Sequence, residues 1–305
     1  MKSEKSLIII GFILISVIWG STWLAIKIGL ESISPFYGIA LRFSIASLIL
    51  FLILKLRNEK IPFDKNSILL YLNLAVLSFS FPFALVYWGE QYIASGLASV
   101  LFGVYPFMVA IGSHLFLKSE KLNVYKSFGI VFGFIGIVLI FWSDIKFGKS
   151  NICGMIAILA STIMQAASLV MLKRVNHQIS PTSLTFGGMF FSLFFIYPMA
   201  LLFEDFSKLI FDAKGVYSIL YLGTFGTVMT FVVYYWLMKR VEIVYLSLVS
   251  FVTPVLAVLL GTILLQEKLS QSVFFGAAFV LIGILIANLK DIKIVLKDRM
   301  TNFQI

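Results

Sequence analysis

The chain has 305 residues, of which 60% are hydrophobic and only 12% are charged, and its mean hydropathy is +1.02. A soluble domain is about half apolar and about a quarter charged, so this chain cannot assemble a water-facing surface and lipid must be its solvent. Its net charge of +10 is explained by the basic loops of a membrane protein and needs no nucleic-acid partner. The single cysteine, Cys153, excludes an internal disulfide.

Ten apolar runs are long enough for helices that cross a bilayer core of about 30 Å. They are continuous rather than alternating, which favours helices over the strands of a membrane barrel. The first run follows Lys2 and Lys5 as a signal peptide would, but it is long for one and no small-residue cleavage site follows it. We expect spans at residues 7–29, 36–54, 67–88, 94–117, 124–142, 152–172, 182–203, 216–238, 243–265 and 271–289.

The placement of basic residues predicts the orientation of these spans. If the N-terminus lies inside, the inside segments hold 17 Lys and Arg residues and the outside loops hold 5. Such a bias favours cytoplasmic loops for the basic segments. The sequence therefore predicts a multi-pass protein of the plasma (inner) membrane with both termini in the cytoplasm and Cys153 near the outer face.

The chain repeats itself with a period close to 147 residues. Short strings recur in order at offsets of 146 to 148: Ile33-Ser34-Pro35 as Ile179-Ser180-Pro181, Tyr87-Trp88 as Tyr235-Trp236, Pro106 as Pro254, and Glu120-Lys121-Leu122 as Glu267-Lys268-Leu269. We divide the chain into repeats at 1–147 and 148–305. Five spans is an odd number, so the second repeat is inverted relative to the first. Inverted repeats are typical of transporters that rock about a site between two bundles, although a duplication kept for stability alone would look the same.

Several of these motifs together resemble a known family. Trp19-Gly20-Ser21-Thr22-Trp23 ends the first span, Leu41-Arg42-Phe43 lies in the second, and mid-span prolines and Glu-Lys-Leu strings recur in both halves. The chain in this respect resembles the EamA-type branch of the drug/metabolite transporter superfamily over residues 7 to 289. The resemblance implies helices around a central cavity, with spans 5 and 10 at the periphery. Members mostly export amino acids or related metabolites, and the substrate does not follow from the family.

Polar residues within lipid-spanning helices tend to face the interior of the bundle. Candidate substrate-binding residues are Trp19, Thr22, Trp23 and Lys27 on one face of span 1, Tyr87, Ser99, a row of Ser161, Gln165 and Ser168, then Thr227 and Tyr234, and Ser250. Small residues also serve helix packing, and Tyr and Trp also form belts at membrane interfaces. Packing and belts are therefore the alternative interpretation of this set.

Arg42 and two prolines allow sharper hypotheses. Arg42 lies well inside span 2 and can bind a substrate carboxylate with two hydrogen bonds. The alternative is a structural ion pair with Glu90 or Glu31, both expected at the outer surface. Pro106 and Pro254 interrupt equivalent spans of the two halves, which predicts paired hinges beside a transporter's binding site.

The residue types that are missing from the expected spans narrow the function. Glu90 is placed in a polar turn, so no expected span holds an Asp or Glu, and no motif for a metal, a cofactor or a catalytic triad is present. We therefore expect a secondary transporter of small metabolites, an amino-acid or similar exporter that works by alternating access without an intramembrane carboxylate. The alternatives are uptake on the same scaffold and a membrane-embedded lipid-modifying enzyme. Gly129-x-x-x-Gly133 allows a weak homodimer as well as a monomer.

Overall fold

The structure, a computed structural model, describes residues 2–117, 122–144, 149–175, 179–238, 240 and 249–301. The described residues form helices and contain no strand. The first repeat contains α1 (Lys2–Gly29), α2 (Pro35–Leu56), α3 (Lys65–Leu74), η1 (Ala75–Ser80), α4 (Phe81–Glu90), α5 (Ser95–Phe102), α6 (Tyr105–Phe116) and α7 (Val124–Asp144). The second contains α8 (Lys149–Arg174), α9 (Pro181–Phe203), η3 (Phe206–Lys208), α10 (Ala213–Gly223), η4 (Thr224–Met229), α11 (Thr230–Met238), α13 (Val249–Leu264) and α14 (Gln271–Thr301).

The expected all-helical membrane fold is confirmed. Nine stretches of the described chain are long and apolar enough to cross a bilayer, and α13 contributes a shorter apolar helix. The tenth expected span began at residue 243, and residues 243–248 lie outside the described part. Spans 3, 4 and 8 each consist of more than one element, namely α3–η1–α4, α5–α6 and α10–η4–α11.

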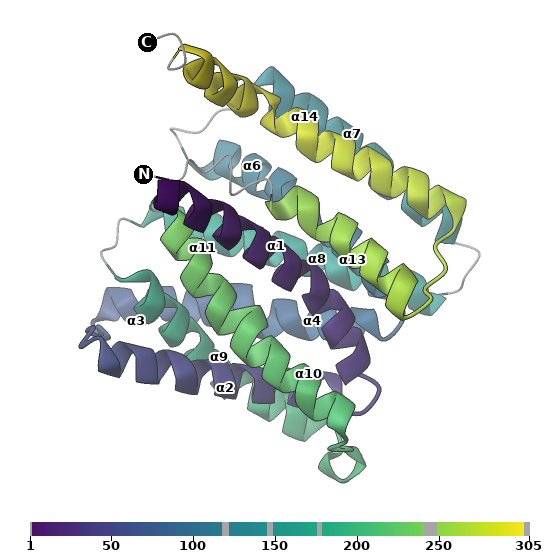
Figure 1. Cartoon of the computed structure of the whole chain (residues 1–305). Helices are drawn as coiled ribbons and strands as arrows, with labels where there is room; N and C mark the ends of the chain where they lie inside the picture. Colours follow the sequence, from purple (N-terminus) through teal and green to yellow (C-terminus); the bar gives the residue numbers. More distant parts are fainter. Residues whose placement is uncertain are drawn as a thin grey trace.

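The helices form one bundle with a separate pair on its flank. In Figure 1, α7 and α14 lie side by side along one edge of the molecule, and each is the last helix of its repeat. Their contact is made through glycines: a Cβ added to Gly129 would lie 2.5 Å from the carbonyl oxygen of Gly283. The glycines of span 5 therefore pack against span 10 of the same chain, as the peripheral placement implies.

The second helix of each repeat begins in the same way. Pro35 and Pro181 occupy the first turns of α2 and α9, where a missing N–H costs nothing. Ser180 caps α9 by accepting a hydrogen bond from the N–H of Ser183 at 3.2 Å. Ser34 makes no such bond at the start of α2, and a residue of the other repeat supplies the acceptor there, as described below.

The third helix of each repeat is interrupted by a π-helical segment. η1 and η4 are each six residues long, and they begin 149 residues apart, close to the period of the sequence repeat. In η4 the hydroxyl of Thr227 donates to the carbonyl of Leu222 at 2.8 Å, and that of Thr230 donates to Gly226 at 3.0 Å. Such side chains satisfy carbonyl groups for which lipid offers no partner, and π segments occur mostly at functional sites.

The two prolines predicted as hinges behave differently. The chain is not α-helical at Gly103 and Val104, and Pro106 lies in the first turn of α6. Pro254 lies inside α13, which continues on both sides of it. A Cβ on Gly103 would lie 3.5 Å from the ring of Pro254. The break before α6 therefore lies against Pro254, but α13 itself is not broken there.

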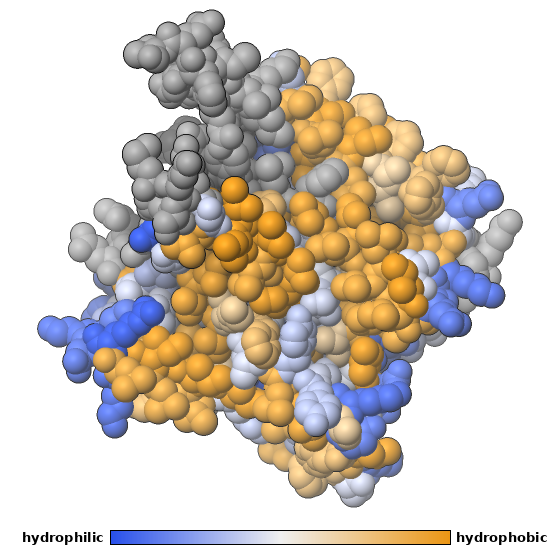
Figure 2. Space-filling model, viewed as in Figure 1, coloured by the Kyte–Doolittle hydropathy of each residue, from blue (hydrophilic) through white to orange (hydrophobic). Residues whose placement is uncertain are grey.

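Charged residues gather at the two ends of the bundle, which we name by their chemistry. The basic end carries Arg57, Lys60 and Arg240, and the acidic end carries Glu204 and Glu267. Figure 2 shows apolar side chains across the middle of the visible face, with hydrophilic residues on either side. This is the surface of a protein that spans a bilayer between two polar ends.

Candidate functional site

A pocket of about 540 Å³ lies at the basic end, where α2, α9 and α11 converge. Its mouth is polar and its floor is apolar, as expected of a site that orients a small solute. The lining residues are Leu50, Arg57, Glu59, Lys60, Pro62, Ile179, Ser180, Pro181, Thr182, Thr185, Phe231, Val232, Trp236 and Arg240. We call this the basic pocket.

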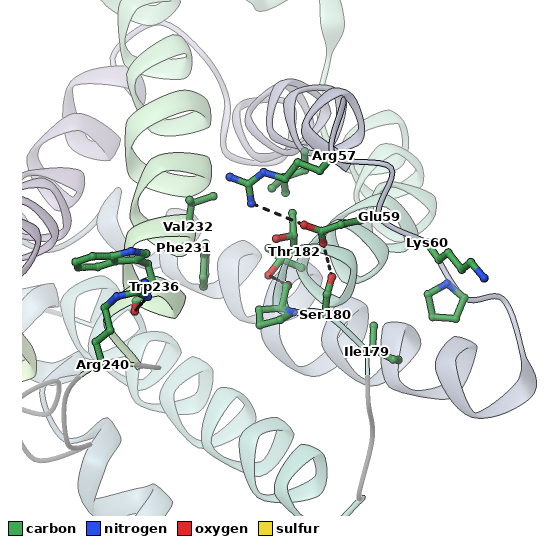
Figure 3. Close-up of a pocket in the computed structure, with 14 residues that line it drawn as sticks. Arg57, Glu59, Lys60, Ile179, Ser180, Thr182, Phe231, Val232, Trp236 and Arg240 are labelled. Carbon is green, nitrogen blue, oxygen red and sulfur yellow. Dashed lines mark hydrogen bonds and ion pairs between the residues drawn. The ribbon is translucent and has the colours of Figure 1, made fainter. Parts of the chain in front are cut away.

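One wall of the basic pocket joins the two repeats through a carboxylate. Glu59 follows α2 and accepts a hydrogen bond from the hydroxyl of Ser180 at 2.8 Å. Arg57 lies 3.8 Å from the same carboxylate, and its side chain is 56% exposed. Figure 3 shows this chain of contacts across the pocket from Arg57 to Ser180. An ion pair this exposed adds little stability.

The opposite wall presents an aromatic ring and a second guanidinium. Trp236 and Arg240 lie one turn apart, and the guanidinium carbon of Arg240 is 4.4 Å from the centre of the indole ring. Figure 3 places this pair across the pocket from Arg57 and Glu59. The mouth therefore combines mobile positive charge with an aromatic face, which suits a solute that has an anionic group and an apolar part.

Four phenylalanines separate the floor of the basic pocket from the middle of the bundle. Phe231 lines the floor, and its ring centre lies 6.4 Å from that of Phe79 in η1. Phe43 of α2 lies 5.7 Å from Phe79 and 5.1 Å from Phe83. We call these four rings the phenylalanine layer. Edge-to-face contacts at such distances are favourable, so the four rings pack against one another between Phe231 and Phe83.

Arg42 lies directly beyond the phenylalanine layer. Its side chain is 4% exposed, and its guanidinium carbon is 4.9 Å from the centre of the Phe83 ring. It donates to the hydroxyl of Thr227 at 3.1 Å and to the hydroxyl of Tyr87 at 3.3 Å. Within the described residues no carboxylate lies within 4.0 Å of it. A buried cation bound only by neutral groups is costly.

The structural ion pair considered for Arg42 is not formed. Glu31 instead binds Lys214 at 2.8 Å on the surface of the acidic end. Glu90 lies near enough to Arg42 for a Coulomb interaction but makes no contact of ion-pair length with it. Arg42 is thus a buried cation held by two neutral hydroxyls, at the point where α2, α4 and η4 meet.

The acidic end is closed by contacts between the repeats. The carboxylate of Glu204, which follows α9, accepts hydrogen bonds from the N–H groups of Phe36 at 2.8 Å and Tyr37 at 3.0 Å. The hydroxyl of Ser34 donates to it at 2.7 Å. A carboxylate at a helix N-terminus also interacts favourably with the helix dipole. Glu204 therefore supplies the cap of α2 that Ser34 does not.

A second carboxylate makes the same kind of cap one helix pair away. Glu267, which follows α13, accepts from the N–H groups of Ser95 at 2.8 Å and Gly96 at 3.2 Å, at the start of α5. Lys27 of α1 donates to the carbonyls of Glu90 and, at 2.8 Å, Ile93. These contacts hold α1, α4, α5 and the end of α13 together.

The expectation that Glu90 lies in an exposed turn is wrong. Helix α4 continues to Glu90, whose side chain is 0% exposed. Both carboxylate oxygens are buried without a hydrogen-bond partner. The reason is packing: Gly89 and Gly154 let α4 and α8 approach so closely that a Cβ on either would lie 2.9 Å from the other's carbonyl oxygen. A buried carboxylate therefore ends the apolar stretch Lys65–Glu90.

The structure brings some of the sequence-predicted site residues together and not others. Arg42, Tyr87 and Thr227 are in direct contact. The ring centre of Trp19 lies 5.5 Å from that of Tyr234 and 6.0 Å from that of Phe231 of the pocket floor. The remaining predicted residues are distributed as follows: Thr22 donates to the carbonyl of Trp19, Trp23 packs on Phe102, Lys27 lies at the acidic end, and Ser99 is buried.

Of the predicted row on α8, only Ser168 has a hydrogen bond to another helix among the described contacts. Ser161 donates to the carbonyl of Ile158 in its own helix, and Ser168 accepts from Asn73 at 3.0 Å and Ser78 at 2.8 Å. Gln165 is half-buried. The side chain of Ser250 lies outside the described residues. Sequence reasoning missed the basic pocket and the phenylalanine layer, although Ile179-Ser180-Pro181 and Trp236, which line the pocket, belong to repeated strings.

The fold and the site together define a multi-pass membrane protein with inverted repeats and a polar pocket that leads toward a buried cation. Residues 6–142 and 152–289 each match the model of the EamA-like transporter family. The chain belongs to this family. Small-molecule transport across a membrane is therefore its function class, and the resemblance seen in the sequence motifs is confirmed.

The chain is similar over nearly its whole length to several transporters that are named as uncharacterized. It is 28% identical over 278 residues to YoaV of Bacillus subtilis, covering 91% of this chain and 95% of that one. It is 31% identical to a transporter of Archaeoglobus fulgidus over 88% and 94%. The inner membrane transporter YedA of Escherichia coli is 27% identical over 90% and 88%. A crystal structure at 18% identity shares the fold with a TM-score of 0.66, covering 93% of this chain and 98% of that one.

Proposed function

We propose that this protein exports a small metabolite that carries a carboxylate, such as an amino acid, by alternating access. The basic pocket faces the cytoplasm in this proposal, because the bias of Lys and Arg residues favours the basic end inside. The metabolite loads there, passes the phenylalanine layer and binds Arg42. The conformation described here is then open to the cytoplasm and closed at the acidic end.

The observation that carries this proposal is the environment of Arg42. Its hydrogen bonds to Thr227 and Tyr87 go to neutral hydroxyls, and the guanidinium can still form a bidentate pair with a carboxylate. Thr227 belongs to η4, and Tyr87 belongs to the helix that continues from η1. An anion at Arg42 would therefore act on both interrupted helices at once, which gives a substrate a physical way to favour one conformation over another.

The proposed direction, export, is supported by the side on which this conformation has its pocket. An exporter loads from the cytoplasm, and the basic pocket is the wide opening of this conformation. Uptake on the same scaffold would use the same Arg42 and differ only in which gradient drives it. Proteoliposomes first identify the substrate. Cells that express the protein then distinguish export from uptake, because an exporter makes them lose this substrate and an importer makes them accumulate it.

The test is counterflow in proteoliposomes with a panel of labelled amino acids and related metabolites. Arg42→Gln should lower transport of a carboxylate substrate by about 10-fold to 100-fold, because a hydrogen bond to a charged group contributes about 1.5–3 kcal/mol. The amide analogue of that substrate should lose much less. Arg57→Gln is the matched control, since Arg57 is half exposed at the pocket mouth and should lose at most a few-fold. Equal losses for acid and amide would overturn the role of Arg42.

A further inference from the structure

Glu90 is a buried group at the acidic end to which the proposed transport pathway assigns no role. It ends α4, it is 0% exposed, and neither carboxylate oxygen has a hydrogen-bond partner. Most buried polar groups in proteins are paired, so a group that is not needs a specific explanation. A carboxylate is the least tolerable case, because an isolated ionised carboxylate costs far more to bury than a neutral hydroxyl does.

The nearest cation does not neutralise Glu90. Lys27 is close enough to interact with its charge, but its ammonium group donates to two backbone carbonyls, those of Glu90 and Ile93. Carbonyls at the end of a helix attract a cation through the helix dipole. Lys27 is thus bound to the end of α4 and not to the carboxylate.

The other groups that face Glu90 are also engaged elsewhere. Arg42 of α2 binds Thr227 and Tyr87. Glu267, which follows α13, caps α5 through two N–H groups and adds a second negative charge near Glu90. On its own helix Tyr87 lies one turn away. Against α8 the neighbouring surface of α4 packs through Gly89 and Gly154, and among the described residues the charges that act on Glu90 are those of Lys27, Arg42 and Glu267.

A carboxyl group in this position is tolerable when it is neutral. We propose that Glu90 is a proton-binding site, and that the acidic end closes only after Glu90 has taken a proton from the solution at that end. One proton is transferred from a hydronium ion to the carboxylate when the end is open, and it returns to water on the same side when the end reopens. The closed state thereby avoids an unpaired ion among Lys27, Arg42 and Glu267.

The proton regulates the cycle in this proposal and does not drive it. The residues that line the basic pocket do not include Glu90, and the phenylalanine layer and Arg42 lie between the two. The proton therefore has no route to the basic end in this conformation. Acid at the acidic end should hold the protein in the conformation described here, and alkali should favour opening of that end. The inference uses the alternating access of the proposed function, but its test does not involve transport.

The experiment measures opening of the acidic end as a function of pH. Ile93→Cys places a thiol at a site that is 3% exposed, in a Cys153→Ser background, and a hydrophilic maleimide reports its accessibility in nanodiscs. The labelling rate is divided by that of the exposed Cys153 of the unsubstituted protein, which removes the pH dependence of the reagent. Between about pH 5 and 8, we expect the relative rate to fall several-fold as the pH is lowered.

The variants decide which group carries the proton. Glu90→Gln imitates the neutral carboxyl and should label slowly at every pH. Glu31→Gln is the matched control, because Glu31 is an exposed carboxylate of the same end, paired with Lys214, and it should keep the full pH dependence. The proposal is overturned if the relative labelling rate still depends on pH in Glu90→Gln. It is also overturned if this rate does not depend on pH in the protein that retains Glu90.

A second measurement protects the test against a Glu90→Gln protein that does not fold. Infrared spectra of the unsubstituted protein should contain the C=O band of a neutral carboxyl, and the titration of this band should share the midpoint of the Ile93→Cys labelling. Different midpoints would contradict the proton site. Counterflow enters neither measurement, so failure of the proposed transport function leaves this result readable, and the reverse also holds.

Discussion

Glu204 and Glu59 follow the second helices of the two repeats, yet only Glu204 caps the helix that it faces. Its carboxylate accepts from two backbone N–H groups of α2 and from the hydroxyl of Ser34. Glu59 accepts only from the hydroxyl of Ser180, the residue equivalent to Ser34. The contacts of Glu204 and Glu59 are equivalent in the two inverted repeats, but Glu204 accepts more hydrogen bonds than Glu59 does. The helices are therefore held together more tightly at the acidic end than at the basic end in this conformation.

Removing the charge of Glu204 should therefore open the acidic end. Glu204→Gln weakens two charge-assisted bonds and the interaction with the dipole of α2, about 0.5–2 kcal/mol in total. We expect a cysteine at Ile33, which is 2% exposed, to react several-fold faster with a hydrophilic maleimide in a Cys153→Ser background. Glu59→Gln is the matched control at the other end and should not increase this rate. Equal rates in both variants would mean that Glu204 does not hold the end closed.

The phenylalanine layer should limit the size of the solute that passes. Phe231→Ala removes the ring between the basic pocket and Phe79. We expect counterflow of the bulkier substrates in the panel to rise by roughly 10-fold relative to the smallest one, which corresponds to about 1.4 kcal/mol. Phe225→Ala is the control, because Phe225 is 48% exposed and stacks on Tyr221. An unchanged size preference would show that the layer is not the barrier.

Much of the fold could be predicted from the sequence, because membrane-spanning helices are recognised by the length and apolar composition of their runs. The expected span at 36–54 is α2 at Pro35–Leu56, and 182–203 is α9 at Pro181–Phe203. The peripheral placement of α7 and α14 also followed from the family resemblance, but their contact with each other was not predicted. The π segments could not be predicted, since nothing in the composition of Ala75–Ser80 or Thr224–Met229 distinguishes them from ordinary helix.

The site was predicted only in part, for a physical reason. Helical periodicity places a residue on a face but does not say which helices meet that face. Arg42, Tyr87 and Thr227 were each singled out, and their contact depends on the packing of α2 and α4 against η4. Glu90 was misplaced because a polar residue beside Gly89 and Gln91 is typical of an exposed turn. Its burial depends on the close approach at Gly89 and Gly154, which the sequence does not show.

The contact between α7 and α14 should tolerate no side chain at Gly136. A Cβ there would lie 2.5 Å from the carbonyl oxygen of Gly276 and 2.9 Å from the backbone nitrogen of Val280. Backbone atoms cannot rotate away, so the helices must separate, at a cost of about 1–3 kcal/mol. We expect Gly136→Ala to lower the melting temperature of the detergent-solubilised protein by several degrees. Gly11→Ala is the control, because its nearest neighbours are side-chain atoms of Val233 and Leu237; an equal loss there would refute the argument.

The orientation of the bundle can be tested with the cysteine that the chain already contains. Cys153 is exposed near the start of α8, at the acidic end. The 17-to-5 bias of basic residues predicts that this end faces outward. A membrane-impermeant maleimide should therefore label Cys153 in intact cells, and Cys153→Ser should abolish the signal.

A C-terminal reporter tests the same orientation independently. Both termini should be cytoplasmic, because an even number of spans returns the chain to the side on which it began. A fluorescent protein fused to the C-terminus should fold and fluoresce, and an alkaline phosphatase fusion should stay inactive. If Cys153 were labelled only after the cells are opened, and the phosphatase fusion were active, the orientation of the bundle in the membrane would be the reverse of the predicted one. The basic pocket would then face outward, and the same geometry would describe a carrier that loads its substrate from outside the cell.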